Sequence, residues 1–328
     1  MGTRSERASR PGLLPWHQSR VADERILRLS KREGQRQLLF LPAAVLKLGL
    51  NRSERRALVV EAERSAAAAR HAFWAGLTVG TLAVVRAGLL SRRFPSVQLT
   101  DFDAVAQIVE ERLEACIPLP RHPIPEELLR RSQALALLDA AERDGLSAML
   151  EGQLLPRSSM HGDLHFFNFV RSGAGFRIID WEHFDPDGSF VFDYVDFHVS
   201  VDHVNRKRYW PDTLDSVDAG HPALQRAAAA SGTAPQALLA HYLLLKIDTM
   251  IARRGGPGGI APTEWEDLLA VLRRAIVPDR ATSVWGTSAG MCAAPGANAW
   301  GAGVGMSSSP APTAPAPRAA DRGGASAG

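Results

Sequence analysis

The chain has 328 residues, of which 45% are hydrophobic, and its formal net charge is +3. A chain of this length and composition can bury the cores of two lobes or that of one ordinary domain. Its two cysteines, Cys116 and Cys292, support neither a disulfide framework nor a thiolate metal site, in agreement with a reducing compartment.

The sequence predicts a cytoplasmic protein without a membrane or nucleic-acid partner. The apolar stretch at residues 75–90 is too short for a membrane span and contains Arg86, and residues 38–50 contain Lys47 and Pro42. The Arg-rich N-terminus lacks the uninterrupted apolar segment of a secretory signal. The arginines there are interpreted as solvated surface or phosphate-binding groups, so nucleic-acid binding is not expected.

The first part of the chain has the pattern of a small sheet. Strands are expected, in chain order, at residues 25–30, 37–41, 43–49, 82–86 and 89–94, the last ending at Pro95. In the third strand, Leu46 and Leu48 point to one face and Lys47 points to the other. The loop between the first two strands has a single glycine, Gly34, which is as typical of an ordinary hairpin as of a phosphate-binding loop.

A helix is expected between the third and fourth strands. Residues 54–72 contain no Gly or Pro and are rich in Ala, Arg and Glu, and Ser53 is a plausible N-cap. From Asp101 the chain becomes mainly helical. One helix is predicted to begin there, and others are predicted at residues 125–145, 235–254 and 262–277. Beyond residue 280 the Gly-, Ala-, Ser- and Pro-rich sequence predicts a disordered tail.

Two motifs carry chemistry. The first reads His-Gly-Asp at residues 161–163 and reaches Asn168 after four further residues, and the second reads Asp-Trp-Glu from Asp180 after an apolar strand at residues 176–179. Transfer of a γ-phosphoryl group needs an acceptor for the proton of the attacked hydroxyl and hard oxygen ligands for Mg²⁺. Asp163, Asn168 and Asp180 can supply these functions.

This pattern resembles the aminoglycoside phosphotransferase and choline kinase family, relatives of the protein kinases in which Gly replaces the Arg of His-Arg-Asp. The resemblance implies an α+β, bilobal, protein kinase-like fold with a small antiparallel sheet lobe and a larger, mainly helical lobe. Residues 1–95 would form the nucleotide-binding lobe, with 1–20 flexible, residues 96–280 the catalytic and substrate lobe, and 281–328 the tail. ATP and Mg²⁺ would be bound, with Asp163 as the catalytic base and Asn168 and Asp180 as metal ligands.

A kinase centre also needs a lysine on the third strand of the sheet and a glutamate on the following helix to hold it. Lys47 has the required position. Glu61 and Glu63 both lie on the expected helix, and Glu61 is preferred because it shares a stripe with Leu58, Ser65 and Ala68. By the resemblance, Asp193 would brace the backbone of the catalytic loop ahead of a buried helix.

The expected activity is therefore transfer of the γ-phosphate of ATP to a hydroxyl of a small molecule of aminoglycoside, amino-alcohol or sugar type. The sequence does not choose between ATP and GTP, nor does it predict an oligomeric state. Four acids would suit a cationic acceptor, whereas the basic run at residues 206–208 would suit an anionic one. These acids are Asp185, Asp187, Asp196 and Asp202.

Two other functions are compatible with parts of the sequence. A pseudokinase would bind nucleotide without turnover, although a scaffold has no need of all three motif residues. A metal-dependent hydrolase would use the His- and Asp-rich cluster as zinc or di-metal ligands, but it leaves Lys47 and Asn168 unexplained. Its ligands would be drawn from His161, Asp163, His165, Asp180 and His183.

Overall fold

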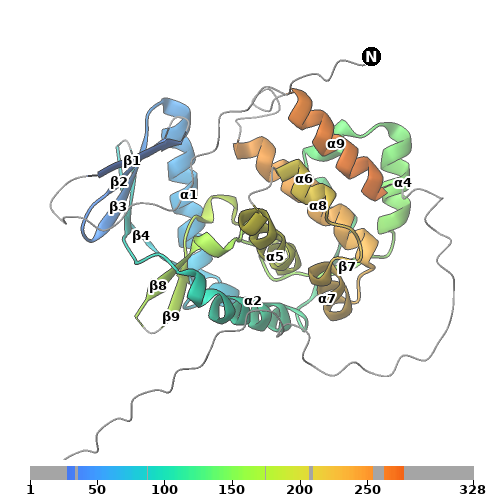
Figure 1. Ribbon diagram of the computed structural model, residues 1–328, viewed down its shortest axis with the longest axis horizontal. Coiled ribbons are helices and arrows are strands. Elements are labelled where there is room, and N and C mark those ends of the chain that lie inside the picture. Colours follow the sequence, from blue (N-terminus) through green and yellow to red (C-terminus); the bar gives the residue numbers. More distant parts are fainter. Residues whose placement is uncertain are drawn as a thin grey trace, which may run out of the picture. The chain divides into compact units, whose positions relative to one another are not determined.

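The computed structural model describes residues 28–33, 36–86, 88–173, 175–206, 210–253 and 262–276. The predicted α+β class is confirmed, because a small antiparallel sheet precedes a larger, mainly helical part (Figure 1). Residues 1–20, Gly34 and the predicted tail at 281–328 lie outside the described residues. Within the described ranges, no helix has both the length and the apolar composition needed to cross a membrane.

The sheet has five antiparallel strands in the order β1-β2-β3-β5-β4. Their bounds are β1 Arg28–Glu33, β2 Arg36–Phe40, β3 Ala44–Gly49, β4 Thr81–Val85 and β5 Gly88–Arg92. The five predicted strands are thus confirmed within the described residues, with ends shifted by a few positions. Lys47 pairs with Leu38 on one side and Leu89 on the other, so it lies in the middle of the sheet.

Helix α1, Arg52–Arg70, lies beside this sheet (Figure 1). The predicted stripe is confirmed, since Leu58, Glu61, Ser65 and Ala68 are buried. The N-cap prediction was wrong. Asn51, with an extended backbone, accepts a hydrogen bond from the Glu54 N–H at 2.8 Å, and the helix is already under way at Ser53.

The remainder of the chain is built from helices joined by short strands and turns. The helices are α2 Phe102–Cys116, α3 Ile124–Arg131, α4 Ala140–Leu150, α5 Phe190–Arg206, α6 Trp210–Asp215, α7 Pro222–Ser231, α8 Pro235–Arg253 and α9 Pro262–Ile276. The strands form two antiparallel pairs, β6 Arg121–Pro123 with β7 Leu154–Pro156 and β8 Phe169–Ser172 with β9 Gly175–Ile178. The helices predicted at the C-terminal end of this part are confirmed as α8 and α9.

The single helix predicted at residues 125–145 is instead α3, a turn of 3-10 helix at Ala134–Leu137, and α4. Two polar side chains interrupt the helical path between residues 125 and 145. Asp248 of α8 accepts the Ala134 N–H at 2.7 Å. Asp139 begins α4 with a capping box, because it accepts the Glu142 N–H while the Glu142 side chain accepts the Asp139 N–H.

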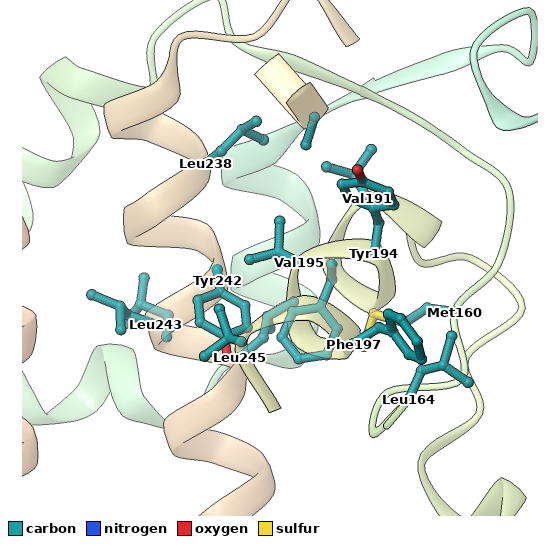
Figure 2. Packing of buried hydrophobic residues seen from close by; sticks show 14 of the residues in the cluster. Met160, Leu164, Val191, Tyr194, Val195, Phe197, Leu238, Tyr242, Leu243 and Leu245 are labelled. Carbon is teal, nitrogen blue, oxygen red and sulfur yellow. The ribbon is translucent and has the colours of Figure 1, made fainter. Parts of the chain in front are cut away.

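Helix α5 runs through the core of the helical part. Phe190, Phe192 and Phe197 on this helix are each at most 1% exposed. Figure 2 shows Met160 and Leu164, from the loop that carries the first motif, on one side of α5 and Tyr242 of α8 on the other. No bounds were predicted from the sequence for α5, α6 and α7. Asp193 lies in the first turn of α5 rather than ahead of it.

Candidate active site

The first motif lies on a tight loop between β7 and β8. Gly162 has φ = 85°, in the region that favours glycine, and a Cβ atom there would lie 2.7 Å from the Cβ atom and the carbonyl oxygen of His183. Any larger residue would force the loop away from the segment that follows Asp180. The glycine that replaces the arginine of His-Arg-Asp therefore permits this close approach.

Asp193 fastens the loop to the core. Its carboxylate accepts the His161 N–H at 2.6 Å and the Gly162 N–H at 2.8 Å, and the side chain is fully buried on α5. The His161 ring holds the other side of the loop, since its Nε2 donates to the Ile179 carbonyl at 2.9 Å. Burial lowers the pKa of His161 to about 4, so the ring is neutral near pH 7.

Asn168 brings the two motifs together. Its side-chain Nδ2 donates to the backbone carbonyl of Asp163 at 2.8 Å, and the backbone carbonyl of Asn168 accepts the Ile179 N–H at 2.9 Å. Asp180 is the residue after Ile179, and its backbone has a left-handed conformation with φ = 64°. The Oδ1 atom of Asn168 and the carboxylate of Asp180 are hard oxygen donors of the kind that Mg²⁺ prefers, so these residues fit the predicted ion.

Lys47 reaches this centre from β3. Its Nζ atom lies 2.5 Å from Oε1 of Glu61 and also contacts Oδ1 of Asp180. Burial lowers the pKa of Lys47, but the carboxylates of Asp180 and Glu61 outweigh it and raise the pKa above its usual value. Glu63 is exposed on α1, so the structure pairs Lys47 with Glu61 and not with Glu63.

Arg36 is a further residue of the site that sequence reasoning missed. Its Nε donates to Glu54 of α1 and its Nη1 to Glu182 of the second motif, both at 2.6 Å. Arg36 thus connects β2, α1 and the segment after Asp180. No local pattern predicts this link, because Glu182 lies 146 residues further along the chain.

Lys246 is the second residue that was missed. It lies on α8 with 1% of its surface exposed, and its Nζ atom is 2.7 Å from Oδ1 of Asp196 and 3.5 Å from Oδ1 of Asp163. The available signal was a single lysine that follows three leucines and precedes Ile247. No role was predicted for this lysine from the sequence.

The acids that were predicted to suit a cationic acceptor are engaged elsewhere. Asp196 is fully buried, beside Lys246, and Asp185 pairs with Arg130 and Arg131 at 2.5 and 3.0 Å. Asp187 pairs with Arg157 at 2.5 Å. Each of these three carboxylates therefore already has a basic partner within the chain. The side chains of Asp202 and of residues 206–208 lie outside the described part.

Two histidines of the motif region, His165 and His183, lie beside acids that are close to them in the sequence. Nε2 of His165 lies 3.7 Å from Oδ2 of Asp163, and Nε2 of His183 lies 3.6 Å from Oε1 of Glu182. In the part of the chain that the structure describes, no three His, Cys, Asp or Glu side chains are grouped so that they could hold a metal ion. The cluster considered for a metal-dependent hydrolase is therefore not assembled.

Comparisons with known proteins gave structural matches only. No family model and no curated protein sequence matches the chain. A choline/ethanolamine kinase family protein from Mesorhizobium loti is 16% identical, with a TM-score of 0.38, and the match covers 75% of this chain and 92% of that one. An ethanolamine kinase from Plasmodium vivax is 12% identical, with a TM-score of 0.47 and coverages of 77% and 82%.

A third match is a thermostable aminoglycoside phosphotransferase mutant, solved in a ternary complex with ADP and hygromycin B. It is 13% identical, with a TM-score of 0.46, and the match covers 76% of this chain and 92% of that one. The solved structures that this chain resembles thus include choline/ethanolamine kinases and aminoglycoside phosphotransferases.

Proposed function

We propose that this chain is an ATP-dependent phosphotransferase that moves the γ-phosphoryl group of ATP to a hydroxyl of a small molecule. One observation carries the proposal: the ammonium of Lys47 contacts the carboxylates of both Glu61 and Asp180. A fixed cation between the sheet and the metal-binding acid is what the phosphates of a nucleotide require in a kinase-like site.

Asn168 and Asp180 are the residues that would hold Mg²⁺. Their donors are hard oxygens, and the hydrogen bond from the Ile179 N–H to the Asn168 carbonyl keeps the two residues adjacent. A bound Mg²⁺ supplies positive charge that neutralises the phosphoryl oxygens. Lys47 would hold the phosphates that lie farther from the acceptor, while Glu61 keeps the ammonium in place.

Asp163 is the residue that would act on the acceptor hydroxyl. Its carboxylate takes the proton that the hydroxyl loses as the acceptor oxygen forms its new bond to the γ-phosphorus, while the bond from that phosphorus to the β,γ-bridging oxygen breaks and ADP leaves. Asp193 fixes the backbone on one side of Asp163 through His161 and Gly162, and Asn168 donates to the Asp163 carbonyl. The carboxylate is therefore oriented before the acceptor arrives, which lowers the cost of reaching the reactive geometry.

The charges around the site favour some acceptors over others. Asp185, Asp187 and Asp196 are each paired with Arg or Lys, so they offer little attraction to a polycation. This supports an acceptor of sugar or amino-alcohol type over a strongly cationic aminoglycoside.

The proposal is tested by incubating the protein with Mg²⁺ and either ATP or GTP across a panel of sugars, amino alcohols and aminoglycosides. Acceptor-dependent ADP or GDP release, with a phosphorylated product seen by ³¹P NMR, is the expected result. The Asp163→Asn variant serves as the matched control and should lose this turnover. Nucleotide binding without turnover on any acceptor would favour the pseudokinase, and metal-dependent hydrolysis without nucleotide would favour the hydrolase.

A further inference from the structure

Lys246 is a buried cation in the helical part of the protein. Its side chain is 2% exposed, its Nζ atom lies 4.4 Å from the centre of the Trp210 ring, and its nearest carboxylate oxygen is Oδ1 of Asp196 at 2.7 Å. Asp196 in turn accepts the hydroxyl of Tyr242 at 3.2 Å. A buried charge is costly unless it is paired, and the contact with Asp196 already meets that need.

The position of Lys246 goes beyond this pairing, because its ammonium also faces the catalytic loop. Nζ lies 3.5 Å from Oδ1 of Asp163, so one ammonium stands between the carboxylate of α5 and that of the loop. Thr249, one turn further along α8, donates to the Gly162 carbonyl at 3.3 Å. Helix α8 therefore contacts the loop at both its backbone and its acidic side chain.

Helix α5 supports the same loop through two of its acids. Asp193 accepts the backbone N–H groups of His161 and Gly162, and Asp196, one turn later, holds Lys246. The two acids lie three residues apart and so share one face of the helix. Asp193 fixes the loop backbone, and the pair of Asp196 and Lys246 fixes the charge beside the Asp163 side chain.

We propose that Lys246 is a positioning residue of the phosphotransfer centre, which holds the Asp163 carboxylate in the orientation that faces the acceptor hydroxyl. The inference rests on the proposed function. The ammonium lies 3.5 Å from Oδ1 of Asp163, so its attraction restrains the side-chain torsion angles of this acid. Asp163 is buried, so little water competes with the ammonium for the carboxylate.

Other titratable groups also lie close to Asp163. His165 of the same loop lies 3.7 Å from Oδ2, and burial lowers the pKa of this histidine, so it is neutral near pH 7. Asp193 of α5 is bonded to the loop backbone, and burial raises its pKa to about 8. Lys246 is thus the cation that α8 presents to the Asp163 carboxylate.

The alternative is that Lys246 serves only to neutralise Asp196 in the core. The two roles separate in the double variant Lys246→Met/Asp196→Asn, which removes both charges together and keeps side chains of similar size. Such a replacement leaves no unpaired buried charge, so the double variant should fold even if Lys246→Met alone does not. The amide oxygen that Asp196→Asn introduces would still accept the Tyr242 hydroxyl. Asp248→Asn, on the same helix but bonded to the Ala134 N–H, is the matched control.

The test compares kcat and the KM for nucleotide for the wild type, the double variant and Asp248→Asn. In the double variant, kcat should fall by roughly tenfold to a hundredfold with the KM for nucleotide unchanged, because the base is misplaced while the phosphate contacts remain. Wild-type kcat in the double variant would overturn the inference.

A second measurement does not depend on turnover. The three-bond coupling between the backbone nitrogen and the carboxyl carbon of Asp163 reports its χ1 angle by NMR in labelled protein, and Asp163→Asn identifies the signal. The coupling should indicate one fixed rotamer in the wild type and averaged rotamers in the double variant, and an unchanged coupling overturns the inference. If the wild type turns over no acceptor, the proposed function fails, but this coupling still decides whether Lys246 orients Asp163.

Discussion

The Nζ atom of Lys47 lies 2.5 Å from Oε1 of Glu61, which joins the third strand of the sheet to α1 at the place where Lys47 also meets Asp180. If this ion pair presents the ammonium to nucleotide phosphates, Glu61→Gln and Lys47→Ala should both weaken binding of Mg²⁺-ATP. The gain in Tm on adding Mg²⁺-ATP should fall by roughly 3 °C for each tenfold loss of affinity. Differential scanning fluorimetry with and without Mg²⁺-ATP measures this gain in Tm.

Glu63→Gln is the control for this prediction, since Glu63 lies two residues away on the same helix and is exposed. Its Tm gain on adding Mg²⁺-ATP should match that of the wild type. Equal gains in all four proteins would remove the pair from the nucleotide site.

The N-cap of α1 gives a prediction about stability alone. Asn51→Ala removes the side chain that accepts the Glu54 N–H and should lower the free energy of unfolding by about 1 kcal/mol. Ser53→Ala, within the first turn, should change it by no more than about 0.5 kcal/mol. Urea denaturation of the two variants decides between them, and a larger loss for Ser53→Ala would restore Ser53 as the cap.

Burial of His161 predicts a loss of stability in acid. The unfolded chain takes up a proton at this side chain below about pH 6.5, whereas the folded protein, with a pKa of about 4, does not do so until lower pH. The unfolded state therefore binds more protons between these values, and the free energy of unfolding falls as the pH drops. The contribution of this one group is up to about 3 kcal/mol over the window.

His161→Gln tests this contribution, because glutamine keeps an N–H donor for the Ile179 carbonyl and does not titrate. Urea denaturation between pH 7 and pH 4 should give a shallower fall in stability for the variant than for the wild type. Parallel curves would show that His161 is protonated equally in both states.

The sequence predicted the parts of the site that depend on local pattern. Lys47 follows from the resemblance, which requires a lysine on the third strand, and Glu61 follows from the stripe of the next helix. Asp163, Asn168 and Asp180 follow from spacing within two motifs, and the structure brings all three to one centre through the hydrogen bonds of Asn168 and Ile179.

Contacts between distant segments could not be predicted in this way. Arg36 meets Glu182 only because the sheet and the second motif come together in the fold, and Lys246 meets Asp163 only because α8 packs beside α5. The prediction of a single helix at residues 125–145 was wrong for the same reason, since the side chain that accepts the Ala134 N–H belongs to Asp248, far along the chain. A helical pattern does not reveal a partner from another element.

The assignment of the two catalytic acids can be tested by separating binding from transfer. Asp180 contacts Lys47 and adjoins Asn168, so Asp180→Asn removes negative charge from the expected Mg²⁺ site. It should weaken metal-dependent nucleotide binding as well as turnover. Calorimetry of ATP binding with and without Mg²⁺ measures the first effect.

Asp163 lies deeper, beside Lys246, and its carbonyl is bonded to Asn168. Asp163→Asn should preserve binding of Mg²⁺-ATP while lowering transfer by about a hundredfold or more, because the amide cannot accept the proton of the acceptor hydroxyl. The amide has nearly the shape of the carboxylate, so the loop and its hydrogen bonds to Asp193 should persist. If Asp163→Asn abolished Mg²⁺-ATP binding while Asp180→Asn left it intact, the two roles would be reversed.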